Sequence, residues 1–343
     1  MKDYKYKVFC RCATFNHADY IKDALDGFCM QVTSFPYVCL IMDDASTDGE
    51  QEVIFRYMEE YFDVKDTSTV IERETDDYRL TFARHKSNRN CYFIALYLKY
   101  NHYSLRKDRT PYYDEWSRVS EYQAFCEGDD YWISPHKLSK QVEFLDNNPN
   151  YSAVFADIII RNEKVNPPTE ARNRREQNHY SLRDVYCGKV FPVNSTCVRN
   201  EVWNHQNEFA TLKTNGDIKW SYMYAKFGYI YKMDEYFSVY RKTGKGLSSQ
   251  WDARDQFIHD ITEWYDFFRQ IGFPDKTRHA LFQSQLINNY IYGHGFNKFP
   301  YKEIKSSLFA SRWYIYILTS IIYPFKRVKN SIIIRIRRVY GKG

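Results

Sequence analysis

The sequence predicts an α/β fold, in which a mixed, mostly parallel sheet is flanked by helices and is followed by a C-terminal helical extension. Strand-like and helix-like segments alternate along the first half of the chain. The strand-like segments include continuous apolar runs, which suit strands that are buried on both faces. Two of these runs end in clustered carboxylates, and the carboxyl ends of strands are where open α/β sheets bind ligands.

Short runs rich in β-branched, aromatic and other apolar residues predict the strands. They are residues 6–14, 37–42, 69–72, 122–126, 152–156, 190–198 and 237–241. The second strand ends at Asp43-Asp44, and the fourth ends at Glu127-Gly128-Asp129-Asp130.

Apolar residues three and four positions apart predict the helices. These are residues 18–29, 50–61, 90–100, 137–146 and 218–227, with largely helical character over 251–309. The cluster Ser46-Thr47-Asp48 is a good N-cap for the second helix. Residues 106–118 and 161–180 are polar and are predicted as loops. The chain therefore divides into an α/β region (1–250), a helical accessory region (251–310) and a tail (311–343).

The basic character of the chain is concentrated in the tail. The formal net charge is +6, but seven cations and no acid lie between residues 326 and 342, so residues 1–325 carry about −1. A general nucleic-acid binder would carry its charge on a folded face, which argues against that class. Residues 313–325 are apolar and aromatic but too short to span a bilayer. This composition predicts an anchor on an anionic membrane surface, with a helix packed on the body or an oligomer contact as the alternatives.

The eight cysteines form no CxxC pair, and most lie inside apolar runs. Buried free thiols are therefore expected. The first seven residues are polar, and no signal peptide is recognised. Together these observations predict a cytoplasmic protein in a reducing compartment, held peripherally at the inner face of the cell membrane by its tail.

The two acidic strand ends point to metal-assisted chemistry. Adjacent carboxylates repel one another unless a cation or a hydrogen-bonded ligand offsets the charge. Mg²⁺ or Mn²⁺ on a diphosphate would do so, because hard cations prefer carboxylate and phosphate oxygens. For Asp43-Asp44 a solvated, capping turn is the alternative. Asp217, at the start of a predicted helix, could likewise serve only as a cap.

The motifs resemble those of glycosyltransferase family 2, which comprises inverting enzymes with the Rossmann-like GT-A fold. The matching segments are residues 13–21 (ATFNHADYI), 42–49 (MDDASTDG), 125–132 (FCEGDDYW), 216–220 (GDIKW), and Tyr240-Arg241 with 244–249. In the family these are the first strand and loop, the second-strand signature, the DxD-type metal motif, the segment of the catalytic base and the closing element. Their order and spacing match over residues 6–250.

The resemblance implies a nucleotide-sugar donor, UDP-linked, and a role for each matched residue. Asp217 would be the general base. The metal ligands would be Asp129, Asp130 and Glu127, holding Mg²⁺ or Mn²⁺. Donor-binding residues would be Thr14, Phe15, Asn16, Asp43, Asp44 and Asp129, with Asp44 accepting from uracil N3–H. Arg84, in the basic segment 84–90, is a further candidate for gripping the diphosphate, and a solvated loop is its alternative.

Three departures from the family pattern stand out. Ala13 replaces the usual Pro, and Glu127 replaces the commoner Asp, which leaves direct metal ligation by Glu127 open. The closing element usually carries a His where this chain has Thr243, and Lys242 or Lys245 could supply a cation in its place.

The family analogy also suggests the acceptor, a lipid-linked glycan of a surface polysaccharide. Other classes compete with this interpretation. A sugar nucleotidyltransferase lacks support because no Gly-rich phosphate loop follows the first strand. A dehydrogenase is disfavoured because G-x-G-x-x-G is absent there. A catalytically inactive nucleotide-sugar-binding or scaffold protein stays open.

Overall fold

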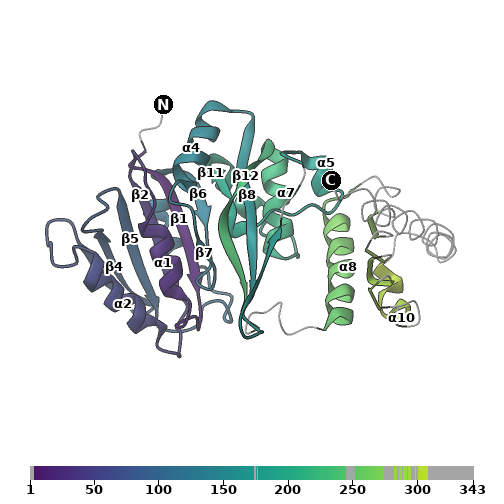
Figure 1. Ribbon diagram of the computed structural model, residues 1–343, viewed down its shortest axis with the longest axis horizontal. Coiled ribbons are helices and arrows are strands. Elements are labelled where there is room, and N and C mark those ends of the chain that lie inside the picture. The colour runs from purple at the N-terminus through teal and green to yellow at the C-terminus, as the bar shows by residue number, and fades with distance from the viewer. Residues whose placement is uncertain are drawn as a thin grey trace, which may run out of the picture. The chain divides into compact units, whose positions relative to one another are not determined.

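The computed structural model describes residues 4–173, 175, 177–244, 252–273 and parts of 282–307. These residues fall into two compact units. The sheet unit lies within residues 1–182, 190–210 and 217–249, and the helical unit lies within 183–189, 211–216 and 250–343 (Figure 1). The predicted tail, 311–343, lies outside the described residues.

One sheet runs through the sheet unit. Its strands are β1 (Tyr6–Thr14), β2 (Tyr37–Asp43), β3 (Ile71–Glu74), β4 (Tyr78–Arg84), β5 (Cys91–Leu98), β6 (Ser120–Phe125), β7 (Tyr131–Trp132), β8 (Tyr151–Asn162), β9 (Thr169–Asn173), β10 (His179–Tyr180), β11 (Cys197–Arg199) and β12 (Tyr229–Lys242). The order is β10-β12-β8-β11-β6-β1-β2-β5-β4-β3, with β7 on β12 and β9 on β8. The six strands β1, β2, β5, β6, β8 and β12 run in one direction. The predicted mixed α/β fold, with its sheet flanked by helices, is therefore confirmed.

Helices cover both faces of this sheet. α1 (Ile21–Cys29), α2 (Glu50–Tyr61) and α4 (Lys137–Asn147) bury their apolar sides on one face, against alternate residues of β1 such as Cys10 and Cys12. Figure 1 shows α1 and α2 in front of the strands. The short helix α3 (Asp114–Ser117) covers the other face, where Trp116 packs with Phe9. The same alternation puts Phe125 against Trp203 of α6 (Asn200–Trp203), and Trp203 packs in turn on Trp220 of α7 (Gly216–Phe227).

Three predicted elements are wrong. Residues 90–100 form the strand β5 rather than a helix, because the run CYFIALYL is buried on both faces and such a short apolar run has no periodicity to separate the two structures. The segment 161–180 is not one loop, since β8 continues to Asn162 and is followed by β9 and β10. Within 190–198 only the last two residues belong to a strand, β11, after a 3₁₀ turn at Val193–Ser195.

Other boundaries moved by smaller amounts. The strand predicted at 69–72 is β3, displaced by two residues, and its partner β4 was not predicted. Residues 106–118 contain a 3₁₀ turn, Thr110–Tyr112, before α3. β12 begins eight residues earlier than predicted. The prediction of buried free thiols is confirmed for six cysteines: Cys10, Cys12, Cys39, Cys91, Cys126 and Cys197.

The described part of the helical unit has the helical character that was predicted. α8 (Ala253–Gln270) begins at Asp252, whose side chain accepts from the backbone N–H groups of Arg254 and Asp255. Its apolar side packs with α10 (Tyr301–Ile304) in a small core around Ile261. Among the helices that can be described, none is both long enough and apolar enough to cross a bilayer. The boundaries at 250 and 310 remain predictions.

Candidate functional site

The carboxyl ends of β2 and β6 flank the end of β1, as the sequence predicts. Thr14 lies opposite Asp43 in the parallel pair, and the backbone N–H of Asp44 donates to the carbonyl of Thr14 (3.0 Å). On the other side, the N–H of Gly128 donates to the carbonyl of Ala13 (3.2 Å). A Cβ atom on Gly128 would lie 1.9 Å from Thr14 Oγ1, so only glycine fits here. The two acidic motifs therefore meet at one edge of the sheet.

The loop after β1 is tied to the loop after β2. Asn16 adopts a left-handed conformation (φ 58°) that asparagine tolerates well. Its N–H donates to Ser46 Oγ (2.8 Å), and its Oδ1 accepts from the N–H of Thr47 (2.8 Å). The side chain of Phe15 projects outward and is 41% exposed. Of the predicted nucleoside residues in this loop, Phe15 is therefore the accessible one, while Asn16 joins the loops.

A buried glutamate, Glu50, holds this junction together. It accepts hydrogen bonds from Thr14 Oγ1, from the N–H of His17 (2.9 Å) and from Ser46 Oγ (2.8 Å). Burial raises the pKa of Glu50 to about 7, against the lowering effect of these donors. Thr14, itself almost fully buried, is thus a structural link between β1 and α2. Glu50 was not singled out from the sequence, where it looks like an ordinary acid in a first helical turn.

The two carboxylates at the end of β2 have different surroundings. Asp43 Oδ1 accepts from the N–H of Ser46 (3.0 Å) and from Gln51 Nε2 (2.6 Å), which supports the loop as the resemblance implies. Burial raises the pKa of Asp43. Asp44 accepts from the N–H groups of His102 (2.7 Å) and Tyr103 (2.9 Å).

Arg109 Nη1 lies 3.5 Å from Asp44 Oδ2. An ionised carboxylate offers about four lone-pair sites, so Asp44 keeps room for one more donor such as a pyrimidine N–H. Asp44 is 4% exposed, and all three of these contacts come from the segment 101–109.

Asp129 and Asp130 are adjacent in sequence, but their carboxylates differ in burial and in hydrogen-bond partners. Asp130 is 3% exposed, and its two oxygens accept from Asn194 Nδ2 (2.9 Å) and from the N–H of Arg241 (2.8 Å). Burial and the nearby charges of Asp129 and Glu127 raise its pKa. Asp129 keeps an accessible carboxylate, 3.8 Å from His17 Nε2. Asp130 therefore holds the loop, and Asp129 is the acid available to a ligand.

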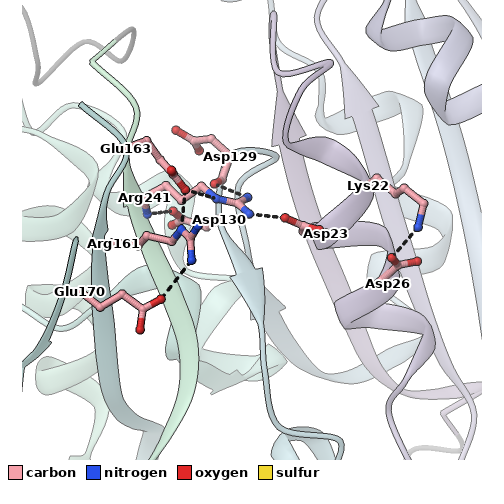
Figure 2. Close-up of polar contacts among 9 residues, drawn as sticks. All are labelled: Lys22, Asp23, Asp26, Asp129, Asp130, Arg161, Glu163, Glu170 and Arg241. Carbon is pink, nitrogen blue, oxygen red and sulfur yellow. Dashed lines mark hydrogen bonds and ion pairs between the residues drawn. The ribbon is translucent and has the colours of Figure 1, made fainter. Parts of the chain in front are cut away.

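Arg241 connects the acidic loop to α1 and to the end of β8, as Figure 2 shows. Its guanidinium donates to the carbonyl of Asp129 (3.2 Å) and pairs with Asp23 of α1, and Nε lies 3.3 Å from Glu163. The group also stacks on Tyr131, 4.3 Å from the ring centroid. The motif Tyr240-Arg241 was the sequence signal for this residue, although no site role was predicted for it.

Asn194 is a further residue for which no site role was predicted from the sequence. It is buried, its side-chain amide donates to Asp130 (2.9 Å), and its backbone carbonyl accepts from Trp132 Nε1 (2.8 Å). The sequon Asn194-Ser195-Thr196 therefore has a packing explanation, because the side-chain amide is already used inside the core.

Asp217 and Glu127 approach each other from different elements. Asp217 is exposed in the first turn of α7, as predicted. Glu127 is also exposed, and desolvation by its surroundings together with the charges of Asp217 and Asp129 raises its pKa to about 7. Two turns further along α7, the buried hydroxyl of Tyr224 has no hydrogen-bond partner among the residues that the structure describes. The predicted base and the acidic loop thus share one locality.

The prediction for Arg84 is wrong. β4 is antiparallel to β5, and Arg84 pairs with Tyr92 near the start of β5. Tyr92 in turn lies opposite Val38, at the amino end of β2, whereas Asp43 lies opposite Tyr97. Five residues of strand separate these positions, about 17 Å along the sheet. Arg84 donates to the carbonyl of Arg89 (2.6 Å) and belongs to the opposite edge, so it cannot grip a donor at the acidic motifs.

The predicted metal ligands fit a divalent cation in part. Asp130 does not fit as a direct ligand, because both oxygens are engaged and buried. Asp129 and Glu127 present accessible carboxylates. In the portion of the chain that is described, no group of three His, Cys, Asp or Glu side chains could hold a metal on its own. Mg²⁺ is commonly bound through one or two carboxylates plus substrate phosphates, so Asp129 and Glu127 suit a cation that a diphosphate completes.

The chain was compared with protein families, with curated proteins and with solved structures. No protein-family model matches the chain. Uncharacterized proteins of Mycobacterium tuberculosis and Mycobacterium bovis are 28% identical over 238 residues, covering 68% of this chain. The chain spans 58% of the length of these curated relatives.

Solved glycosyltransferase structures are similar to the chain at low sequence identity. One is S. aureus TarS in complex with UDP-GlcNAc (15% identity, TM-score 0.47, 88% of this chain and 84% of that chain). Another is the mannosyltransferase PcManGT from Pyrobaculum calidifontis in complex with GDP-Man and Mn²⁺ (13% identity, TM-score 0.48, 99% and 89%).

Proposed function

We propose that this protein is an inverting glycosyltransferase that moves a sugar from a UDP-linked donor to an acceptor hydroxyl. The observation that carries the proposal is that Asp44 and Asp129 meet at the carboxyl edge of the sheet, with Asp217 close enough to Glu127 for its charge to raise the pKa of Glu127. The three residues come from separate sequence motifs, and those motifs resemble glycosyltransferase family 2 in order and spacing. Sites built at this edge are the rule for open α/β sheets.

Each of the three acids has a separate task in the proposed reaction. Asp44 accepts the pyrimidine N–H and orients the nucleoside. Asp217 takes the proton from the acceptor hydroxyl as its oxygen attacks the anomeric carbon. The new carbon–oxygen bond forms opposite the bond to the diphosphate, which breaks with its electron pair going to the diphosphate oxygen. An α-linked donor therefore gives a β-linked product.

Asp129, with Glu127, would hold Mg²⁺ or Mn²⁺ on the donor diphosphate. The cation would supply positive charge that stabilises the negative charge growing on the leaving group. Arg241 supports this task indirectly. Its guanidinium donates to the backbone carbonyl of Asp129, and its backbone N–H donates to the carboxylate of Asp130.

The acceptor proposed here is a lipid-linked glycan of a surface polysaccharide. The support is the composition of residues 311–343, in which aromatic and apolar residues are interleaved with cations. A tail of this kind would place the enzyme on the inner face of the cell membrane, where the acceptor lipid is embedded. Vesicle cosedimentation with and without anionic lipid, comparing the full chain with a chain ending at residue 310, tests this part alone.

The central experiment is donor binding and hydrolysis across UDP-, GDP- and dTDP-sugars, with Mn²⁺ or with EDTA. We expect metal-dependent consumption of one UDP-sugar. Asp217→Asn should reduce turnover by about 1000-fold while leaving donor affinity within about twofold. A protein that binds no nucleotide sugar under either condition contradicts the proposal. Equal donor binding with no turnover in the wild type favours the inactive binding protein.

A further inference from the structure

Arg11 is a half-buried cation on the central strand β1. It lies opposite Leu40 of β2 and Phe125 of β6, and its guanidinium stacks on the ring of Tyr113, 5.3 Å from the centroid. Among the residues that the structure describes, it has no hydrogen-bond or ion-pair partner for this group. A guanidinium carries five N–H donors in a plane, so Arg11 has donors that a ligand can use.

The neighbours of Arg11 on its face of the sheet lead to α7. Residues that are paired across two strands project from the same face, so Arg11 and Phe125 share one face. Phe125 packs on Trp203, and Trp203 packs on Trp220 of α7, with ring centroids 4.8 and 4.9 Å apart. Tyr224 lies one helical turn beyond Trp220, on the same side of the helix. Arg11 and Tyr224 therefore belong to one layer between the sheet and α7.

The hydroxyl of Tyr224 is a second unused donor in this layer. Tyr224 is 2% exposed, and no described residue forms a hydrogen bond with its hydroxyl. Burial, followed by the charge of Asp217, raises the pKa of Tyr224, and the charge of Arg11 opposes that shift. The pKa of Glu127, which burial raises, responds to the same two charges. The predicted base, the acidic loop and both unused donors are therefore close together.

A carboxylate is the group that fits these donors, because the planar guanidinium binds its two oxygens side by side. Glu127 does not fill this role, since no ion pair joins it to Arg11 in the described part of the chain. The proposed function also assigns the charge of Glu127 to the metal ion. Arg109 adds a second positive charge nearby, and its pKa is lowered by burial and by the charge of Arg11. A ligand carboxylate would relieve this repulsion.

We propose that Arg11 and Tyr224 bind the carboxylate of an acidic sugar, carried either by the donor or by the acceptor. The inference rests on the proposed function, because this sugar lies where Asp217 would act, and it names the substrate class as a hexuronic acid. The donor diphosphate matches the position less well. Asp129, which the diphosphate would approach, neighbours His17 and Arg241 beside α1.

The test compares matched ligands by calorimetric titration of the full chain with Mn²⁺. UDP-glucuronate and UDP-glucose differ only at C6, as do glucuronate and glucose added to the UDP complex. In one of these two arms, the wild type should bind the carboxylate form at least about tenfold more tightly. Arg11→Met should abolish this preference and keep UDP affinity within about twofold. Arg84→Met should retain the preference. It is the matched control, because the Arg84 guanidinium also lies 5.3 Å from the centroid of a tyrosine ring, at the opposite edge.

A second variant removes a single hydroxyl from the same layer. Tyr224→Phe should reduce the preference by at least about threefold, and it decides the matter alone if Arg11→Met fails to fold. A folded Arg11→Met protein that loses UDP affinity itself would place Arg11 at the diphosphate and overturn the inference. UDP binding with no carboxylate preference in either arm, or with a preference that both variants retain, overturns it and leaves the proposed transferase standing. If the wild type binds no UDP, both proposals fail.

Discussion

The two acidic strand ends look alike in sequence and differ in how their charges are satisfied. At the end of β2, both carboxylates accept hydrogen bonds from the protein: Asp43 from Ser46 and Gln51, and Asp44 from the segment after β5. At the end of β6, both oxygens of Asp130 accept hydrogen bonds from described residues, whereas Asp129 and Glu127 keep accessible oxygens. Asp43 and Asp130 therefore position the chain, Asp44 combines internal contacts with one remaining acceptor site, and Asp129 and Glu127 keep oxygens that a ligand can reach.

The adjacent pair Asp129 and Asp130 gives the largest expected contrast. Asp130→Ala leaves two buried donors, on Asn194 and Arg241, without acceptors and should lower the free energy of unfolding by about 2–4 kcal/mol. Asp129→Ala should change it by less than about 0.5 kcal/mol. The same Asp129 variant should lower kcat/KM by at least about 100-fold, because charge stabilisation at the leaving group is lost. Urea unfolding and donor turnover on both variants measure this, and equal stability losses would refute the division of roles.

At the end of β2, Asp44→Asn should produce a smaller, mixed effect. The new side-chain amide would place N–H donors against the backbone N–H of His102 or Tyr103. We expect about tenfold weaker UDP binding, with a loss of stability of about 1 kcal/mol. Calorimetric titration of UDP in EDTA measures nucleotide affinity without the contribution of the metal. Unchanged UDP affinity would mean that Asp44 only holds the segment 101–109 and does not contact the nucleoside.

A buried cation beside the second acidic end gives a pH-dependent contrast. Lys137 is fully buried, donates to Gln141 (2.8 Å) and lies 4.1 Å from the centroid of the Trp132 ring. Burial lowers its pKa to about 8. Between about pH 8 and the unfolded value of about 10.4, the unfolded chain binds more protons, so this group adds stability as the pH rises.

Lys137→Met removes that contribution. The unfolding free energy of the wild type relative to Lys137→Met should therefore rise by about 2 kcal/mol from pH 8 to pH 9.5. The same comparison between pH 6 and pH 7 should be flat. A constant difference across the whole range would show that Lys137 titrates normally. Chemical denaturation at each pH, with both proteins in parallel, provides the measurement.

The smallest effect is expected at the opposite edge of the sheet. Arg84→Ala should leave donor affinity and kcat within about twofold, because the side chain lies about 17 Å along the strands from the acidic motifs. An Arg84 variant that lost donor binding would contradict the strand register.

Arg241→Lys is the matched substitution at the acidic edge. A single ammonium then replaces the guanidinium that reaches Asp23 and Asp129, so this variant should reduce both stability and turnover.

The fold class and the acidic edge were predictable because both follow from local patterns. Apolar runs locate β2 and β6, and each carboxylate motif follows its strand directly. The error at Arg84 came from the neighbouring error at residues 90–100. Once that run was taken as a helix, the antiparallel β4–β5 pair was hidden, and with it the edge to which Arg84 belongs. Short apolar runs carry no period that separates strand from helix.

The partners of the site lay beyond sequence reasoning for a different reason. Asn194 and Arg241 reach Asp130 across 64 and 111 residues. The local sequence around neither residue predicts which strands will lie beside its own. The position of β11 between β6 and β8, for example, follows only from the folded sheet. Glu50 was hidden because an acid in a first helical turn has a sufficient local explanation. Hydrogen bonds between buried polar atoms that are distant in sequence depend on how the sheet packs, so local sequence does not predict them.

The reach of Arg241 also has a consequence for the order in which the protein is made. A growing chain that has left the ribosome through β7 already contains Glu127, Asp129 and Asp130, yet it lacks β12, where the backbone N–H of Arg241 donates to Asp130 and its guanidinium donates to the carbonyl of Asp129. Until residue 241 emerges, the acidic loop has its full negative charge and no β12 to hold it. The site is therefore completed late, when the last strand of the sheet unit pairs with β8 and β7.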